Sequence, residues 1–140
     1  MKLLVQKLNP DAKIPSFAHA NDTAMDICSV VDMTVPPRER VQVPTGLAFH
    51  FPDGYAGLIW DKSGLSQRHG LKSLGGVLDP GFRGEVMIGL YNTSAEPYQI
   101  EKGDKVAQML VQKVEHPDIQ EVSELPESER GVKGFGSTGK

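Results

Sequence analysis

Turn-forming residues interrupt this chain so often that no long helix can run through it. Fifteen glycines and ten prolines are spread over 140 residues. Turn signals recur about every eight to twelve positions, a spacing typical of short strands joined by turns. Pro52-Asp53-Gly54 and Asp79-Pro80-Gly81 are turn sequences of this kind. The sequence therefore predicts an all-β sandwich or barrel.

Between these turns, apolar residues alternate with polar ones as they do in half-buried strands. The pattern predicts strands over residues 3–8, 40–43, 47–51, 55–60 and 85–91. Residues 105–114 fit a helical face slightly better than an alternating strand, but the strand density around them favours a strand. Residues 62–67 are predicted to form one short helical turn.

The size and the charge of the chain narrow its class. A length of 140 residues, with 39% apolar and 24% charged residues, fits one globular domain. We expect a β domain over 1–114, an irregular acidic connector over 115–129 and a flexible Gly-rich arm over 130–140. No apolar run approaches the ~20 residues of a membrane helix. A net charge of −3 argues against nucleic acid or an anionic membrane as the main partner.

The cysteine content and the first residues bear on the cellular compartment. A single cysteine, Cys28, excludes an internal disulfide and a cysteine-based zinc site. It is most simply a small core residue, and it fits a reducing compartment. Gln6 and Lys7 interrupt the apolar start of the chain, so we expect no targeting segment and a cytoplasmic location.

Several polar residues have the chemistry of an anion or metal site, and each also has a purely structural interpretation. Asp26 lies in an apolar stretch, where a salt bridge and a water-mediated metal contact are equally good explanations. Residues 61–65 offer a cation, a hydroxyl and free N–H groups, but spacing alone favours an Asp-initiated turn or helix start. We expect Asp79 to belong to a β-turn, and Gln108 to be a solvated strand residue.

The arm over 130–140 has a chemistry of its own. Consecutive Gly-rich N–H groups, together with Arg130, Lys133 and Lys140, suit a polyphosphate. Phe135 offers a flat apolar face on which a nucleobase can stack. The simpler interpretation is a flexible tail, as for most Gly-rich termini.

Taken in order, five segments make this sequence resemble the trimeric dUTP diphosphatases, or dUTPases. The segments are residues 24–29, 62–65, 76–84, 103–108 and 130–139. The resemblance covers the chain from Asp22 to the C-terminus, and the ending Gly134-Phe135-Gly136-Ser137-Thr138-Gly139 is its most specific part. It implies a jelly-roll subunit and a homotrimer with active sites at subunit interfaces. It also implies that the C-terminal arm closes over a site built by neighbouring subunits.

The resemblance implies a reaction as well: dUTP and water give dUMP and pyrophosphate, which lowers dUTP and supplies dUMP for thymidylate synthesis. Asp79 would be the catalytic residue that activates the water attacking the α-phosphorus. Mg²⁺ would bridge the phosphates, and Asp26 would hold the metal through a water. The implied substrate-binding residues are Lys62, Ser63, Gly64, Gly75, Gly76, Val77, Leu78, Phe82, Met87, Gln108, Arg130, Phe135, Gly136 and Ser137.

Within that set, each group has an implied role. Backbone groups of a tight hairpin over residues 75–87 would select uracil, and Phe82 would pack against the deoxyribose. Gln108 and Arg130 would contact phosphates, and Phe135 would stack on the base. Two positions depart from the family pattern, because Lys62 stands where Arg is usual and Phe82 where Tyr is common. Lysine keeps the charge but loses the planar fork of arginine; we expect activity to survive both changes.

Two other functions compete with this one. The dCTP deaminases, including bifunctional deaminase–diphosphatases, share the fold and the Asp79-Pro80-Gly81-Phe82 signature. Their catalytic Glu follows the motif Asp by ten positions, where this chain has Gly89, and Glu85 on the same strand is out of place for that role. The second alternative is a nucleotide-binding sandwich without turnover. The polar residues retained in the five segments argue against it.

Overall fold

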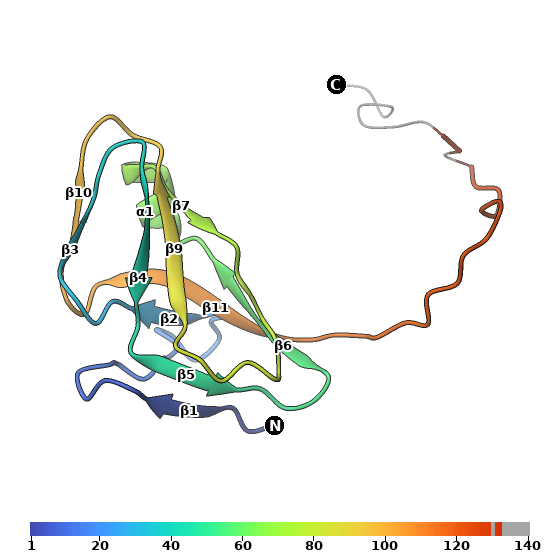
Figure 1. Ribbon diagram of the computed structural model, residues 1–140, viewed down its shortest axis with the longest axis horizontal. Coiled ribbons are helices and arrows are strands. Elements are labelled where there is room, and N and C mark those ends of the chain that lie inside the picture. Colours follow the sequence, from blue (N-terminus) through green and yellow to red (C-terminus); the bar gives the residue numbers. More distant parts are fainter. Residues whose placement is uncertain (130, 133–140) are drawn as a thin grey trace.

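The computed structural model describes residues 1–129 and 131–132. Over these residues the chain forms eleven short strands and one short helix, as expected from its turn spacing (Figure 1). In chain order the elements are β1 (Leu4–Lys7), β2 (Met25–Cys28), β3 (Met33–Val35), β4 (Arg40–Pro44), β5 (Leu47–His50), β6 (Tyr55–Trp60), α1 (Ser63–His69), β7 (Leu71–Leu74), β8 (Val77–Leu78), β9 (Met87–Asn92), β10 (Tyr98–Ile100) and β11 (Lys105–Lys113).

The strands form four small sheets around one core. The largest sheet has the order β2-β11-β6-β8, and a second has the order β4-β9-β7. Two-stranded sheets, β1-β5 and β10-β3, complete the sandwich. Every pairing between these strands is antiparallel. The predicted all-β, jelly-roll-like fold is confirmed.

The core is built from the inward-facing residues of all these sheets. Ile27, Ile88 and Met109, on three different strands, are each at most 1% exposed. Burying one side chain of this size contributes roughly 1.5–3 kcal/mol. Gly57 on β6 has to be glycine, because a Cβ there would lie 2.4 Å from the ring of the buried Phe51. Core packing therefore fixes the position of β6, which carries part of the site described below.

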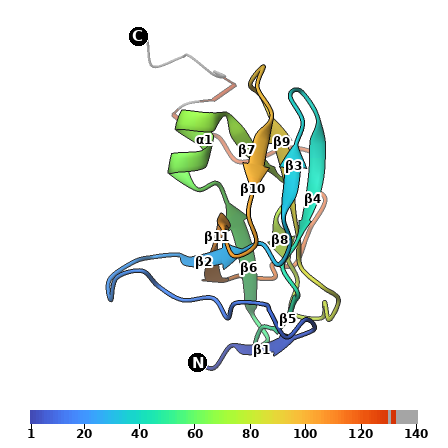
Figure 2. The same cartoon turned by 90° about the vertical axis from the view of Figure 1, so that its left-hand side faces the viewer.

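Most local predictions match these elements. Residues 105–113 form β11, the longest strand, so the alternating pattern prevailed over the helical one. The expected helical turn is α1, which begins at Ser63 and ends at His69. The next residue, Gly70, has the left-handed conformation, with φ 68°. Figure 2 shows α1 beyond the end of β6. Cys28 is buried, as predicted for a small core residue.

A β-bulge interrupts the pairing of β11 with β2. Gln108 lies opposite Asp26 and Ala107 opposite Ile27, but Lys105 is the next residue to pair, opposite Cys28. The extra residue, Val106, is buried beside Ala107. A bulge reverses the alternation of side chains beyond it. Lys105 therefore lies on the same face as Gln108, although the two are an odd number of residues apart.

The segment from Gly75 to Met87 lies between the two arms of a hairpin. Strands β7 and β9 pair from Leu71 opposite Asn92 to Leu74 opposite Gly89. The chain between them leaves this ladder, and β8 pairs with β6 in the other sheet. The segment is thus a long loop held at both sheets, rather than the tight hairpin that we expected.

Residues 115–129 contain no strand or helix, and each of them is exposed. Figure 1 shows them running away from the sandwich after β11. Their apolar side chains include Ile119, which is 97% exposed, and Leu125, which is 83% exposed. Within the described part of the chain, no helix has the length and apolar character needed to cross a membrane.

Candidate active site

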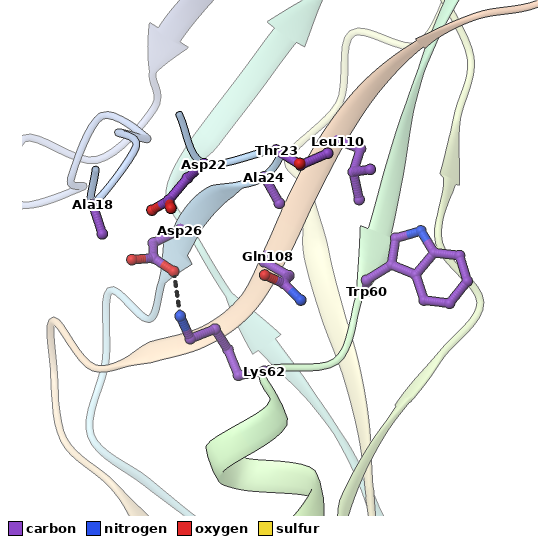
Figure 3. A pocket seen from close by; sticks show the side chains of 9 residues that line it. All are labelled: Ala18, Asp22, Thr23, Ala24, Asp26, Trp60, Lys62, Gln108 and Leu110. Atoms are coloured by element: carbon purple, nitrogen blue, oxygen red, sulfur yellow. Dashed lines mark hydrogen bonds and ion pairs between the residues drawn. The ribbon is translucent and has the colours of Figure 1, made fainter. Parts of the chain in front are cut away.

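Three side chains form one row across the outward face of the largest sheet. Asp26 on β2 lies opposite Gln108 on β11, and Gln108 lies opposite Trp60 on β6. Residues directly opposite each other in an antiparallel ladder point to the same face of the sheet. These three residues, with Lys62, line a cavity of about 410 Å³ (Figure 3). Two of the predicted site segments, 24–29 and 103–108, therefore meet here.

Asp26 is held between two lysines. One carboxylate oxygen lies 2.5 Å from Lys62 Nζ, and the other lies 2.6 Å from Lys105 Nζ. Burial acts to raise the pKa of Asp26, but the hydrogen bonds and charges of Lys105 and Lys62 outweigh it, and the pKa lies below its ordinary value. Of the two explanations that the sequence left open for Asp26, the ion pair is observed.

The β-bulge is the reason that Lys105, in addition to Lys62, reaches this carboxylate. Without the extra residue, the side chain of Lys105 would lie on the other face of the sheet from Gln108 and could not approach Asp26. With it, two ammonium groups surround one carboxylate. Asp22 also lines the cavity and acts on Lys105, so two lysines and two aspartates balance one another there. Lysines that can exchange a carboxylate for a phosphate suit a polyanionic ligand such as a triphosphate.

Gln108 differs from the solvated strand residue that the alternation suggested. Its side chain is half-buried, and Nε2 donates a hydrogen bond of 2.8 Å to the backbone carbonyl of Asp61. An amide nitrogen carries two hydrogens, so this bond leaves one hydrogen and Oε1 for another partner. The side chain is thus oriented beside the cavity before any ligand arrives.

The first turn of α1, directly after β6, carries the second of the five segments. Lys62 and the α1 residues Ser63, Gly64, Gln67 and Arg68 line a second cavity of about 440 Å³. Lys62 therefore lines both this cavity and the one beside Asp26. The predicted grouping of a cation, a hydroxyl and glycine at this turn is observed, next to the row formed by Asp26, Gln108 and Trp60.

Asp61 does not start the helix, contrary to the structural interpretation of its spacing. Lys62 occupies the N-cap position of α1, and no side chain caps the helix there. The carboxylate of Asp61 points instead to β7, where Oδ1 accepts a hydrogen bond of 2.6 Å from the Ser73 N–H. Its other oxygen lies 2.5 Å from Lys72 Nζ. The preference for a local turn was wrong because these β7 partners satisfy the carboxylate.

Asp79 lies on the Gly75–Met87 segment, away from the row. It is exposed, and its carbonyl accepts a hydrogen bond of 3.1 Å from the Phe82 N–H, which closes the predicted turn. Neither Asp79 nor Phe82 is among the residues that line the two cavities described above. Phe82 is 45% exposed. A single chain therefore brings Asp26, Lys62, Gln108 and the 63–64 turn together but leaves Asp79 elsewhere.

The same segment presents backbone groups at a sheet edge. In the described residues, β8 (Val77–Leu78) is the last strand of its sheet and pairs with β6 alone. Gly76 has φ 131°, and its carbonyl accepts a hydrogen bond of 2.8 Å from the Ile59 N–H. An edge strand leaves its outer N–H and C=O groups for another partner. A planar base can bind to groups of this kind.

The position that a deaminase would need for its acid is occupied by a glycine with little space around it. A Cβ on Gly89 would lie 3.0 Å from the Leu74 carbonyl oxygen across the β7–β9 ladder, so even an alanine would be tight. Glu85 is engaged in the fold, because its Oε1 accepts a hydrogen bond of 2.7 Å from the Gly46 N–H. The deaminase alternative is not favoured.

The residues present fit a magnesium ion that arrives with phosphates. Among residues 1–129 and 131–132, no three His, Cys, Asp or Glu side chains gather closely enough to hold a metal. Asp22 and Asp26 are the two carboxylates that line the cavity. Mg²⁺ keeps several waters and is usually held by one or two carboxylates and the phosphates of a substrate. A carboxylate at this position suits such an ion as a contact through water.

Sequence reasoning missed part of this cluster and made predictions beyond the described residues. Trp60 and Lys105 were assigned no role, because only the strand register and the bulge place them beside Asp26. A tryptophan that is 55% exposed is itself a signal of a binding surface.

The predictions for Arg130, Phe135, Gly136 and Ser137 fall on residues outside those that the structure describes.

Comparison with known proteins identifies the family to which this chain belongs. The family model described as dUTPase matches residues 10–139. The deoxyuridine 5'-triphosphate nucleotidohydrolase of Thermobifida fusca is 42% identical over 142 residues, covering 99% of this chain and 79% of that protein. The enzyme of the same name from Clostridium novyi is 43% identical over 141 residues, covering 99% of each.

Solved structures agree with the sequence comparison. A dUTPase of Staphylococcus bacteriophage 80alpha with dUpNHpp superposes with a TM-score of 0.93 at 29% identity, covering 99% of each chain. A mutant dUTPase from phage phi11 of S. aureus, described with a coordinated structural Mg(II) ion, has a TM-score of 0.85 at 26% identity and covers 91% of this chain and all of that one. The fold and its relatives define a class of nucleotide hydrolases on a jelly-roll sandwich. The chain belongs to the dUTPase family.

Proposed function

We propose that this chain hydrolyses dUTP to dUMP and pyrophosphate by attack of water on the α-phosphorus. The observation that carries the proposal is the cross-strand row of Asp26, Gln108 and Trp60, with Lys62 beside it, in a chain of the dUTPase family. The reaction lowers dUTP and supplies dUMP for thymidylate synthesis. It takes place in the cytoplasm, where a reducing environment suits the buried thiol of Cys28.

The row and the turn after β6 bind the triphosphate. Lys62 supplies positive charge between the two cavities, and the free hydrogen of Gln108 Nε2 bonds to a phosphate oxygen. Ser63 and the N–H of Gly64 bind the oxygens on which charge develops as pyrophosphate leaves. Lys62 lacks the fork of arginine, so its contact to phosphate is that of a point charge.

The Gly75–Met87 segment binds the nucleoside. The outer edge of β8, with Gly75 and Gly76 before it, offers N–H and C=O groups to the polar edge of uracil. A site of this kind rejects bases that leave its polar groups unpaired. The exposed side chains of Phe82 and Met87, each more than a third accessible, pack against the sugar and base. Phe82 leaves no room for a ribose 2′-hydroxyl.

Asp79 is the general base. Its carboxylate orients the water and takes its proton as the oxygen bonds to the α-phosphorus; the bond from the α-phosphorus to the bridging oxygen then breaks, and pyrophosphate departs. Because Asp79 lies away from the row in one chain, the complete site is assembled at the interfaces of a homotrimer. In that assembly one subunit supplies Asp79 to the Asp26 cluster of another.

Asp26 and the C-terminal arm would complete the substrate complex. Asp26 would hold Mg²⁺ through a water, and the ion would supply positive charge to the phosphates. Arg130 clamps the γ-phosphate, Phe135 stacks on uracil, and Ser137 with Thr138 adds donors to the phosphates. These roles come from the family resemblance of residues 130–139.

The test is the release of pyrophosphate and of ammonia from dUTP, dCTP, dTTP and UTP in the presence of Mg²⁺. Pyrophosphate from dUTP alone is the expected result, and it reports the reaction and the base and sugar selection together. Ammonia from dCTP would replace the proposal with a deaminase. Binding of dUTP without any product would replace it with a nucleotide-binding protein. Light scattering on the same sample tests the trimer, which a monomer would exclude.

A further inference from the structure

Asp61 bonds to Gln108 of the row and to Ser73, which precedes the Gly75–Met87 segment, and it lines neither cavity. It lies between the end of β6 and Lys62, and its side chain is 19% exposed. The carboxylate bonds to the Ser73 N–H at 2.6 Å and to Lys72 Nζ at 2.5 Å. Its backbone carbonyl accepts the hydrogen bond from Gln108 Nε2 at 2.8 Å. One residue thus contacts β11 through its main chain and β7 through its side chain.

The contact with Gln108 sets the direction of a phosphate-binding group. A free glutamine side chain has several rotamers and two amide orientations. The bond to the Asp61 carbonyl takes one hydrogen of Nε2 and fixes the plane of the amide. The second hydrogen then has a defined direction beside the cavity that Asp26 and Lys62 line. A shift of the Asp61 carbonyl would move this hydrogen.

The contact with Ser73 anchors the segment that binds the nucleoside. Ser73 is the third residue of β7, and Gly75 follows two positions later. Two residues before Asp61, the Ile59 N–H bonds to the carbonyl of Gly76. The end of β6 therefore holds the entry to the Gly75–Met87 segment at two points, one through a side chain and one through the main chain.

Electrostatics agree with this geometry. Burial acts to raise the pKa of Asp61, but Lys72 and the hydroxyl and N–H of Ser73 outweigh it, so the pKa lies below its ordinary value. The carboxylate is therefore charged at neutral pH, and it accepts the Ser73 N–H as a charge-assisted bond. Lys72 is 60% exposed, so its share of the anchoring is small.

We propose that Asp61 is a positioning residue, which aligns the amide of Gln108 with the Gly75–Met87 segment and so couples phosphate binding to base selection. The inference rests on the proposed function. Asp61 touches no reacting atom; it acts through Gln108 and Ser73.

The experiment compares Asp61→Ala, Asp61→Asn and Lys72→Met with the full-length wild type. Asp61→Ala removes the acceptor of the Ser73 N–H. We expect its kcat/KM for dUTP to fall about 10–100-fold, mainly through KM, since small misplacements of binding groups cost this much. The preference for dUTP over dTTP should narrow in parallel. Asp61→Asn keeps an acceptor oxygen, and Lys72→Met leaves the carboxylate in place, so both should stay within about threefold of wild type.

A measurement without nucleotide separates positioning from activity. Amide hydrogen exchange should show the Ser73 N–H protected in wild type, in Asp61→Asn and in Lys72→Met, and at least about tenfold less protected in Asp61→Ala. The side-chain amide signals of Gln108 should shift in Asp61→Ala alone. If Asp61→Ala does not fold, Ser73→Pro removes the same hydrogen bond from the other side and should produce the same rise in KM.

Two results would overturn the proposal. One is an Asp61→Ala enzyme with wild-type kcat/KM and wild-type preference for dUTP. The other is an equal loss for dUTP and dTTP with unchanged Ser73 exchange, because a purely structural residue would act in that way. A wild-type protein that releases no pyrophosphate from dUTP would instead contradict the proposed function, and the exchange data would still show whether Asp61 holds Ser73.

Discussion

The row of Asp26, Gln108 and Trp60 and the Gly75–Met87 segment prepare for a ligand in opposite ways. In the row, the side chains already have protein partners: Asp26 is bonded to two lysines, and Gln108 to a carbonyl. In the segment, the strand edge of β8 is open, and Asp79 and Phe82 are exposed. One region is organised by its own ion pairs, and the other by the sheet that holds its backbone.

Under the proposed function, the difference matches each region to one kind of ligand group. A triphosphate is flexible and highly charged, so charged side chains that exchange partners can follow it. A uracil ring is flat and rigid, and a fixed backbone edge matches its donors and acceptors without a loss of side-chain entropy. Changes in the row should therefore affect phosphate binding, and changes in the segment should affect base choice and chemistry.

The largest effect is expected at Asp79, in the Gly75–Met87 segment. Asp79→Asn keeps the size of the side chain but removes the general base, so kcat should fall by about 10²–10⁴-fold. Binding of dUpNHpp should change little, because the row is intact. Single-turnover kinetics and calorimetry with dUpNHpp measure the two quantities. Preserved turnover would remove Asp79 from its proposed role.

A smaller effect, on stability rather than on chemistry, is expected at Asp26. Asp26→Asn leaves Lys62 and Lys105 without their carboxylate and should cost about 1–3 kcal/mol at pH 7. The pKa of Asp26 is lower in the folded chain than its ordinary value of 3.8. A carboxyl with a depressed folded pKa stabilises the protein above its unfolded pKa, and that contribution is lost as the pH falls through the folded value.

Urea unfolding of wild type and Asp26→Asn at pH 7 and at pH 3 measures this contribution. The gap between their free energies of unfolding should be largest at pH 7 and should shrink below about pH 3.8, the ordinary pKa of an aspartate. Taking the difference between the two proteins cancels the other aspartates with lowered pKa, Asp11 and Asp61. A gap that is constant with pH would mean that the ion pairs contribute nothing to folding.

The smallest effect is expected at Trp60, which offers a direct signal from the row. It is the sole tryptophan of the chain, half-exposed and beside the cavity of Asp26. Adding dUpNHpp with Mg²⁺ should change its emission by roughly tens of per cent, as expected for an amphipathic indole whose surroundings become drier. Trp60→Phe should keep kcat/KM within about fivefold, because an aromatic ring remains. Unchanged emission at saturating ligand would mean that the row does not meet the nucleotide.

The sequence allowed the fold to be predicted, because the fold depends on local signals. The family resemblance indicated five segments as a candidate site, and the described chain brings three of them together beside two cavities. Glycine and proline mark the turns, and alternation marks the strands. Register is a different kind of information. That Trp60 lies opposite Gln108, or that Lys105 turns toward Asp26, follows from cross-strand pairing and from one inserted residue. No pattern in residues 105–113 marks the position of that bulge.

The errors came from side chains whose partners are distant in sequence. Asp61 was expected to start a helix, yet its carboxylate bonds to residues 11 and 12 positions later. Gln108 was expected in solvent, yet its partner lies 47 positions away. A polar side chain in a strand has a local solution and several distant ones, and only the packed sheets decide between them. Local reasoning therefore assigned the wrong contacts to these two residues.

The close approach of Leu74 to Gly89 has an evolutionary consequence. Deaminases and diphosphatases of this fold differ, by resemblance, in an acid that falls at position 89 of this chain. Here a Cβ at that position would lie 3.0 Å from the carbonyl oxygen of Leu74, so the opposite strand would have to give way by a few tenths of an ångström. Acquiring the acid would therefore shift β7 relative to β9, and the Gly75–Met87 segment between them would shift as well. Main-chain spacing in this chain thus opposes a change from one chemistry to the other by a single substitution.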